Sequence, residues 1–362
     1  MNYQSVVESV LAEMQDPNCL RPLSTVADIA SVKVNDSFLE VSLMMPYPVG
    51  SFGRGLATLV EAQLGGQLDG LQPRVTVGWH VQPQAAKGGI PTMQEVKNII
   101  AVASGKGGVG KSTTAVNLAL ALKKEGANVG LLDADVYGPS QAMMLGVPPS
   151  TRPDTEDDKY MLPVLAHGIQ SMSMAYLVDE QTPMVWRGPM VSSALQQMLM
   201  QTKWQQLDYL IVDMPPGTGD IQLTLSQKVP ATGAVIVTTP QDIALLDAKK
   251  GIEMFRKVNI PVLGIVENMA VHVCSNCGHE EHVFGELGGA RLADQYDTRL
   301  LASMPLDMAI RQQADGGEPT VISEPDSEVT IRYQHAALAL ASEVAMLTKS
   351  APNIPSIQIS DD

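Results

Sequence analysis

A glycine-rich run places the strongest constraint on the fold of this 362-residue chain. It matches the pattern G-x-x-x-x-G-K-[ST], which forms a loop around the phosphates of a nucleotide. Residues 99–103 before the run are apolar, as in a buried strand, and residues 114–124 after it have the apolar spacing of a helix. This strand–loop–helix context is the one that the pattern requires. The run consists of Gly105, Lys106, Gly107, Gly108, Val109, Gly110, Lys111, Ser112 and Thr113.

Each part of this loop has a chemical role in a nucleotide site. The glycines let successive backbone N–H groups point toward one centre, and the following helix adds the positive end of its dipole. We expect Lys111 to reach the β- and γ-phosphates and the Ser112 hydroxyl to bind Mg²⁺. A second lysine, Lys106, follows the first glycine, where an ordinary phosphate loop does not need one.

Composition narrows the class of partner. The chain has 24 Lys and Arg against 39 Asp and Glu, a formal net charge of −15. Because an acidic chain repels nucleic-acid phosphates, we expect no nucleic-acid partner. The sequence has neither an apolar stretch of about 18 residues nor a basic C-terminal helix, so we expect no membrane partner. Three cysteines and a start without a basic segment predict a cytoplasmic protein.

Residues 1–82 have the pattern of a small α/β domain. The expected helices cover residues 6–14 and 52–64, and the expected strands cover residues 25–34, 38–45 and 74–81. Asn35 and Asp36, between the first two strands, are typical of a hairpin turn. Residues 83–97 are polar and rich in Pro and Gly, which predicts a linker.

Residues 98–349 alternate strands with helices, which predicts an α/β domain with a doubly wound, mostly parallel sheet. The expected strands are short and rich in β-branched residues, which suits strands buried on both faces. After the first strand they cover residues 129–132, 209–212, 234–238 and 262–266, with a weaker candidate at 300–304. Residues 350–362 have no periodicity and are predicted to be a disordered tail.

Two acidic segments follow two of these strands. In an open α/β sheet, ligands bind beyond the carboxyl ends of the strands, so both segments point to one crevice. The segment DADVYGPS begins at Asp133 and contains Asp135, and the segment DMPPGTGD begins at Asp213. Asp213 fits an aspartate that holds Mg²⁺, followed by a glycine-rich switch that senses the γ-phosphate. The side chain of Asp213 or of Asp135 could instead cap the helix that follows it.

Cysteine and histidine are concentrated in residues 272–282, which hold two of the three cysteines and three of the six histidines. Cys274 and Cys277 form a C-x-x-C pair, which places two thiolates in a tight turn around a metal or a cluster. Three interpretations are open. His279 and His282 could complete a zinc site of unusually short spacing, the pair could be a redox dithiol, or two chains could share one iron–sulfur cluster.

Six segments occur together and in order: GKGGVGKST, LLDADVYGPS, WRGPM, DYLIVDMPPGTGD, TTPQDIALLDAKKG, and ENM followed by CSNCG. From about residue 98 to about residue 340, the chain therefore resembles the Mrp/ApbC family of iron–sulfur carrier ATPases. The loop with its extra lysine is similar to that of a wider group, which includes MinD, ParA and the nitrogenase iron protein. Residues 1–82 resemble, more loosely, the small iron–sulfur-assembly domain often fused to bacterial members.

The resemblance implies roles for several residues. Lys106 reaches across a homodimer to the ATP that is bound by the partner chain. Asp135 orients or activates the attacking water, and Asp133 supports the metal site. Asn268 hydrogen-bonds the adenine ring, since an amide offers the base both a donor and an acceptor. The implied catalytic residues are Lys106, Lys111, Asp135 and Asp213.

The resemblance also implies a cargo. Cys274 and Cys277 of two chains hold one shared cluster, expected to be 4Fe-4S, which passes from scaffold proteins to apo-proteins. The N-terminal domain has Met45-Pro46 where related domains carry a cysteine before proline, so we expect no metal there and an ordinary role for Cys19. The competing class is a MinD- or ParA-like switch that positions partners, with a structural zinc at the C-x-x-C pair.

Overall fold

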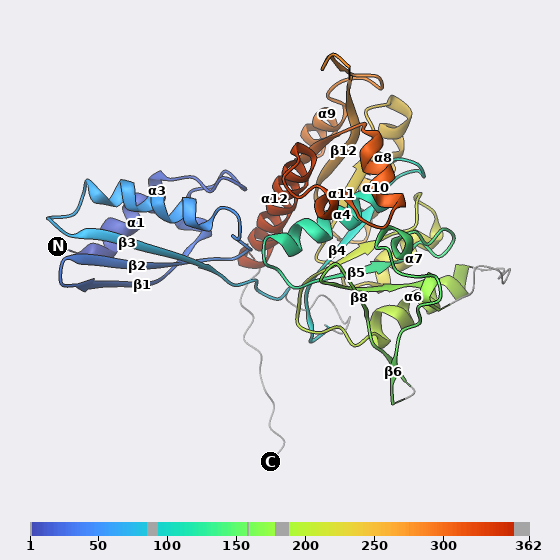
Figure 1. Ribbon diagram of the computed structural model, residues 1–362, viewed down its shortest axis with the longest axis horizontal. Coiled ribbons are helices and arrows are strands. Elements are labelled where there is room, and N and C mark those ends of the chain that lie inside the picture. The colour runs from blue at the N-terminus through green and yellow to red at the C-terminus, as the bar shows by residue number, and fades with distance from the viewer. Residues whose placement is uncertain (1, 85–92, 158, 178–187, 275, 351–362) are drawn as a thin grey trace.

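The computed structural model describes residues 2–84, 93–157, 159–177, 188–274 and 276–350 of the chain. Most of the expected linker, nearly all of the expected tail and the start of the WRGPM segment lie outside these residues. The described part contains a three-stranded sheet near the N-terminus and a nine-stranded sheet beyond it (Figure 1). A small ribbon of β6 (Thr155–Glu156) and β7 (Tyr160–Met161) is separate from both.

The three-stranded sheet consists of β1 (Asp28–Asn35), β2 (Phe38–Met45) and β3 (Gln72–Trp79). β1 and β2 form an antiparallel pair, whereas β3 returns parallel to β2 after α3 (Gly53–Gly65). Buried and partly exposed residues alternate along β2, because only one face of the sheet is well covered. α1 (Tyr3–Glu13) packs against α3, and α3 packs against β3.

The first predicted strand, at 25–34, begins later than expected. Its first residues belong to a short helix, α2 (Leu23–Val26), that follows Pro22. The ring of Pro22 holds φ at −53°, and its carbonyl accepts hydrogen bonds from both the N–H and the hydroxyl of Thr25. A proline with this φ suits the start of a helix, and this local effect overrides the β-branched residues that favour a strand.

The nine-stranded sheet has the order β13-β12-β11-β4-β10-β5-β9-β8, and β14 pairs with β12. Its pairs are parallel except β8 with β9 and β13 with β12, so the predicted mostly parallel sheet is confirmed. Every residue of β5, β10 and β11 is buried, which explains their continuous apolar sequences. The strands are β4 (Val96–Ala103), β5 (Val129–Asp133), β8 (Val164–Ala166), β9 (Ile169–Ser173), β10 (Leu207–Asp213), β11 (Gly233–Thr238), β12 (Val262–Val273), β13 (Glu280–Glu281) and β14 (Leu300–Pro305).

Strands β8 and β9 were not predicted from the sequence. They form an antiparallel hairpin whose turn is His167-Gly168, and both turn residues have positive φ. β9 extends the sheet beyond β5 and brings Ser173 next to Asp133. Its residues mix polar and apolar types, and its burial comes from neighbours distant in sequence, so periodicity alone does not reveal it.

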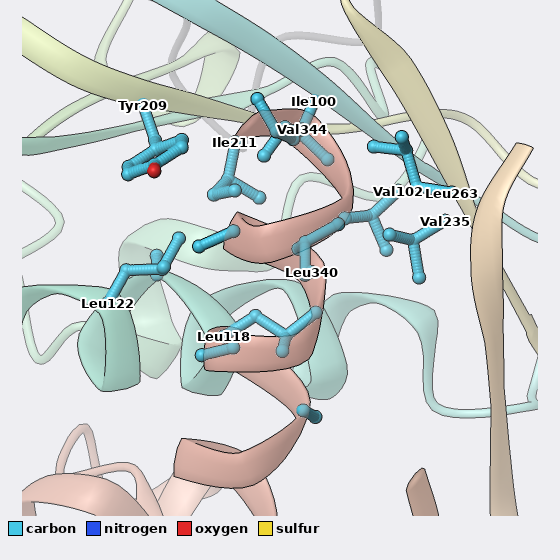
Figure 2. Packing of buried hydrophobic residues seen from close by; sticks show 14 of the residues in the cluster. Ile100, Val102, Leu118, Leu122, Tyr209, Ile211, Val235, Leu263, Leu340 and Val344 are labelled. Atoms are coloured by element: carbon cyan, nitrogen blue, oxygen red, sulfur yellow. The ribbon is translucent and has the colours of Figure 1, made fainter. Parts of the chain in front are cut away.

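Helices cover the faces of the large sheet (Figure 1). α12 packs against α4 and β14, and Figure 2 shows Leu118 and Leu122 of α4 near Leu340 of α12, beneath Ile211 of the sheet. α5 to α9 lie between successive strands, whereas α10 and α11 lie between β14 and α12. The helices of this domain are α4 (Lys111–Lys124), α5 (Gln141–Met144), α6 (Gly188–Gln201), α7 (Asp220–Lys228), α8 (Asp242–Lys257), α9 (Gly288–Gln295), α10 (Met308–Asp315), α11 (Thr320–Ser323) and α12 (Glu328–Ser350), with a 3-10 turn at Met174–Tyr176.

The two sheet-containing parts meet at the C-terminal end of α4. The Glu125 carboxylate is buried there and accepts hydrogen bonds from the Ser51 N–H at 2.8 Å and the Gln334 side chain at 3.0 Å. Lys349 near the end of α12 lies 2.9 Å from Asp28 of β1. Among the described helices, none is long and apolar enough to cross a membrane.

Candidate nucleotide site and cysteine hairpin

The phosphate loop joins the end of β4 to the start of α4. Gly108 and Gly110 have φ values of 80° and 83°, in the left-handed region that residues with a Cβ rarely adopt. A Cβ on Gly110 would also clash with the Asn268 amide, and a Cβ on Gly105 would clash with the backbone of Asp247 in α8. These glycines therefore allow a loop conformation and close contacts that other residues would prevent.

The Lys111 ammonium lies where three motifs of the site meet. It hydrogen-bonds Asp213 Oδ1 at the end of β10, and it lies 3.1 Å from Ser112 Oγ in the loop. Asp135 Oδ2, beyond the end of β5, is 3.8 Å away. Burial raises the pKa of the Asp135 carboxyl, whereas the charge of Lys111 opposes this rise. The structure thus brings together three of the four residues expected to be catalytic.

Asp133 ends β5 and is the register partner of Asp213 in β10. Its buried carboxylate accepts hydrogen bonds from the Gln141 N–H at 3.0 Å and the Ser173 hydroxyl at 3.1 Å. Burial and the nearby charge of Asp213 raise the pKa of Asp133 to about 7, partly offset by the Gln141 hydrogen bond and Lys111. The carboxylates of Asp133 and Asp213 are therefore close together and need a cation to stabilise them. In this structure the Lys111 ammonium is that cation.

Gln141 belongs to this site although the motifs do not reveal it. It is the first residue of α5, and its side chain is buried. Its amide Nε2 donates to Asp213 Oδ2 at 2.8 Å and to the Ser112 carbonyl at 3.0 Å. No general pattern assigns chemistry to a glutamine at the start of a short helix. Its role follows only from the fold, which brings three distant segments together.

Asn268 and Lys106 flank the loop. Asn268 lies where the pairing of β12 with β14 is interrupted, and its Nδ2 donates to the Val109 carbonyl at 2.9 Å. Lys106 is half-buried, and its ammonium makes no hydrogen bond or ion pair with any residue that the structure describes. The roles expected for them, in adenine recognition and in the site of a partner chain, stay predictions.

The C-x-x-C pair lies at the tip of a hairpin formed by β12 and β13. The Cys274 N–H donates to the His279 carbonyl at 2.9 Å, and the Gly278 N–H donates to the Cys274 carbonyl at 2.8 Å. Gly278 has a φ of 72°, which lets the chain turn back directly after Cys277. The hairpin presents Cys277 to solvent, whereas Cys274 is partly covered.

The electrostatics of this turn favour a thiolate. Backbone N–H groups of Asn276 and then Cys277 point at the Cys274 sulfur and lower the pKa of its thiol. Thiolates are the form of cysteine that binds metals and clusters. By contrast, burial raises the pKa of the Cys19 thiol in the N-terminal domain to about 11, so Cys19 is a poorer ligand.

The nearby histidines make other contacts. The His282 ring Nδ1 lies 2.9 Å from the Ala270 carbonyl, and its Nε2 lies 3.8 Å from Glu286. His279 is exposed. Within the described ranges, no group of three or more His, Cys, Asp or Glu side chains is placed to hold a metal ion. The structure therefore does not provide the Cys₂His₂ zinc arrangement that the spacing left open.

Comparison with known proteins places the chain in a family. Residues 95–341 match the model of a family described as ParA, NUBPL iron-transfer P-loop NTPase. The chain belongs to this family. It is 64% identical to an iron–sulfur cluster carrier protein of Pseudomonas fragi over 75% of this chain and 95% of the relative. It is 51% identical to the Escherichia coli K12 protein of that name, over 94% of this chain and 92% of the relative.

More distant relatives extend this result. A mouse protein named iron–sulfur cluster transfer protein NUBPL is 50% identical, over 80% of this chain and 88% of its own length. A solved nucleotide-binding protein from Archaeoglobus fulgidus, in complex with ADP, has a TM-score of 0.57 and 37% identity. This match covers 65% of this chain and 90% of that one. The family resemblance and the α/β phosphate-loop fold predicted from the sequence are therefore confirmed.

Proposed function

We propose that this chain is an ATP-hydrolysing carrier that binds an iron–sulfur cluster between two copies of itself and transfers the cluster to apo-proteins. The observation that carries this proposal is the exposed hairpin with Cys274 and Cys277, in a chain whose close relatives are named cluster carriers. An accessible cluster suits a carrier, because a recipient protein must reach the iron to exchange its ligands.

Sharing between two chains follows from the number of ligands. A cluster of the 4Fe-4S type is held by four cysteine thiolates, and one hairpin contains two cysteines. Two hairpins related by a two-fold axis supply four, with Cys274 and Cys277 of each chain as ligands. The lowered pKa of the Cys274 thiol favours cluster binding, since the thiolate that binds iron forms without a strong base.

The nucleotide site suits MgATP as the second substrate. Lys111 and the backbone N–H groups of the loop bind the phosphates, while the Ser112 hydroxyl and Asp213 hold Mg²⁺. The acidic pair Asp133 and Asp213 fits this assignment, because a divalent cation can replace Lys111 as the neutralising charge. When bound, Mg²⁺ neutralises charge that develops on the phosphates.

The residues around this site have different roles in ATP binding and hydrolysis. Asp135, whose carboxylate lies 3.8 Å from the Lys111 ammonium, orients the attacking water. Lys106, which has no partner in its own described chain, reaches the nucleotide of the second copy. Asn268 holds the loop at Val109 and reads the adenine ring. Loss of the γ-phosphate then changes the contacts of the glycine-rich segment after Asp213.

One strand connects the two sites. β12 carries Asn268 beside the phosphate loop and ends at Val273, directly before Cys274. Five residues separate Asn268 from Cys274, which is at most about 20 Å of chain, and Met269 among them has a left-handed backbone with a φ of 56°. A shift of the loop upon hydrolysis would therefore act on the hairpin through a continuous backbone. This arrangement supports coupling between hydrolysis and cluster release.

Anaerobic reconstitution with iron and sulfide tests the proposal. We expect a visible absorption band, with iron and labile sulfide bound per dimer and a dimer in size-exclusion chromatography. Purification under anaerobic conditions that yields zinc, no iron and no visible band would contradict a carrier role. It would support the competing function, a MinD- or ParA-like switch with a structural zinc. Transfer is then measured as activation of an apo-protein that needs such a cluster.

A further inference from the structure

Gln141 contacts all three motifs of the nucleotide site. Its backbone N–H donates to Asp133 Oδ2 at 3.0 Å, and its side-chain Nε2 donates to Asp213 Oδ2 at 2.8 Å. The same Nε2 donates to the carbonyl of Ser112, the residue after the phosphate-loop lysine, at 3.0 Å. One buried residue at the start of α5 therefore links the acidic ends of β5 and β10 to the phosphate loop.

The orientation of the Gln141 amide is fixed by these partners. A carboxylate oxygen and a carbonyl oxygen only accept hydrogen bonds, so the group that faces both must be the NH₂. The other end of the amide, Oε1, is buried and has no hydrogen-bond partner in the described part of the chain. Burying an acceptor without a donor costs stability, so packing alone favours an apolar side chain at this position.

The two oxygens of Asp213 have different partners. Oδ1 pairs with the Lys111 ammonium, whereas Oδ2 pairs with Gln141. Lys111 is also the group that binds nucleotide phosphates in the proposed function, so its contact with Oδ1 is exchangeable. The contact from Gln141 involves no phosphate-binding group and can persist when nucleotide binds. Oδ1 is thus the oxygen that becomes available to Mg²⁺ and its water ligands.

We infer that Gln141 is a positioning residue, which holds Asp213 Oδ2 so that Oδ1 faces the magnesium of the bound nucleotide. This inference rests on the proposed MgATP site. Gln141 acts on the metal only through Asp213, and the Ser112 carbonyl ties the same amide to the loop that carries the other metal-binding group. Partners that orient metal-binding groups in this way commonly change metal affinity by about 10- to 100-fold when they are removed.

The test measures how Mg²⁺ changes nucleotide affinity, with a fluorescent ADP analogue as probe. In the Gln141→Met variant, we expect affinity in EDTA to change far less than the response to Mg²⁺, because the amide contacts the phosphate loop only at the Ser112 carbonyl and not at Lys111 or a backbone N–H. We call the Mg²⁺ concentration at which nucleotide affinity has made half of its total increase the Mg²⁺ midpoint. In this variant the Mg²⁺ midpoint rises about tenfold. Substituting Mn²⁺ for Mg²⁺ gives a second readout, since the EPR spectrum of bound Mn²⁺ reports its ligand geometry.

Asn117→Leu is the matched control. Asn117 is also a buried amide on an element of the site, and its Nδ2 donates to the Thr113 carbonyl at 2.9 Å. Its Oδ1 accepts the Val321 N–H at 3.2 Å, and among the described residues it makes no hydrogen bond with a carboxylate. Its loss lowers thermal stability and leaves the Mg²⁺ midpoint unchanged. If Gln141→Met is poorly folded, Gln141→Asn, which keeps the amide but shortens its reach, is expected to raise the Mg²⁺ midpoint in the same way.

The outcomes separate this inference from the proposed function. A wild-type Mg²⁺ midpoint and Mn²⁺ spectrum in folded Gln141 variants would overturn the positioning role and leave the nucleotide site intact. A wild-type protein whose nucleotide affinity does not respond to Mg²⁺ would overturn the proposed MgATP site and the inference with it. A raised midpoint in the Gln141 variants but not in Asn117→Leu supports the inference.

Discussion

At the scale of single residues, the site is organised around Lys111. Its ammonium neutralises a buried group of carboxylates and lies beside the hydroxyl that is expected to bind Mg²⁺. A buried ion pair of this kind stabilises little by itself, since desolvation offsets much of the attraction. Its value is that the same ammonium can move to phosphates and release the carboxylates to a metal ion.

We therefore expect Lys111→Ala to lower ATP hydrolysis at least about 100-fold, because the charge that stabilises the transition state is lost. Cluster content should stay near the wild-type value, since the hydrogen bonds and ion pairs of the Lys111 ammonium with described residues involve Ser112, Asp135 and Asp213 and not the cysteines. Phosphate release and iron per dimer are measured on the same preparation. Hydrolysis near the wild-type rate would remove Lys111 from the mechanism.

Cys277→Ala is expected to abolish stable cluster binding. In a shared site the dimer repeats the change, so two of four thiolate ligands disappear. Cys19→Ala is the matched control, because the Cys19 thiol has a raised pKa and lies in the N-terminal domain. Iron and labile sulfide are counted after reconstitution. A complete cluster in the Cys277 variant would contradict the shared site, and loss of the cluster in the Cys19 variant would show that a ligand has been missed.

At the scale of elements, local sequence determines the phosphate loop and much of the sheet. The loop glycines, Lys111 and the strands that precede Asp133 and Asp213 are predictable, because each depends on residues close in sequence. The hairpin of β8 and β9 and the contacts of Gln141 are not predictable in this way. The carboxylate that the Gln141 side chain contacts is 72 residues further along the chain, so only the folded structure reveals the pair.

The loop itself gives an element-scale prediction. Gly110→Ala puts a Cβ at a φ of 83° and against the Asn268 amide, so the loop must distort. The left-handed conformation alone costs about 1–2 kcal/mol. We expect a lower melting temperature, by about 2 °C or more, and weaker nucleotide binding.

Gly107→Ala is the control for Gly110→Ala. Gly107 lacks a positive φ, and nothing lies within 4 Å of the position of an added Cβ. Its melting temperature should therefore match the wild type when both are measured without nucleotide. Equal melting temperatures for the Gly110 and Gly107 variants would show that the left-handed turn is not required for the fold of the loop.

At the scale of the whole molecule, α4 lies between the nucleotide site and the N-terminal sheet. It begins at Lys111 and has 14 residues, about 21 Å of helix, before the buried Glu125 contacts the Ser51 N–H. Within the large sheet, β12 passes the phosphate loop at Asn268 and ends directly before the cysteine hairpin. The phosphate loop is thus in contact with both α4 and β12. α4 leads to the N-terminal sheet, and β12 leads to the cysteine hairpin.

The last prediction concerns the dimer. If Lys106 acts in the site of the partner, Lys106→Ala and Lys111→Ala are each inactive alone, but a mixture of the two regains activity. In the mixed dimer, the chain that keeps Lys111 receives Lys106 from its partner, so one site is complete. Random pairing makes half of the dimers mixed, which gives about one quarter of the wild-type activity per chain.

The reverse arrangement is the control. A chain with both substitutions, mixed with wild type, forms mixed dimers in which neither site has both lysines, so these dimers are inactive. If Lys106 instead acts within its own chain, the first mixture stays inactive and the second keeps activity in the wild-type half of each mixed dimer. Lys106 has no partner among the described residues of its own chain, and this favours the first outcome. Phosphate release from the two mixtures therefore decides whether the composite site exists.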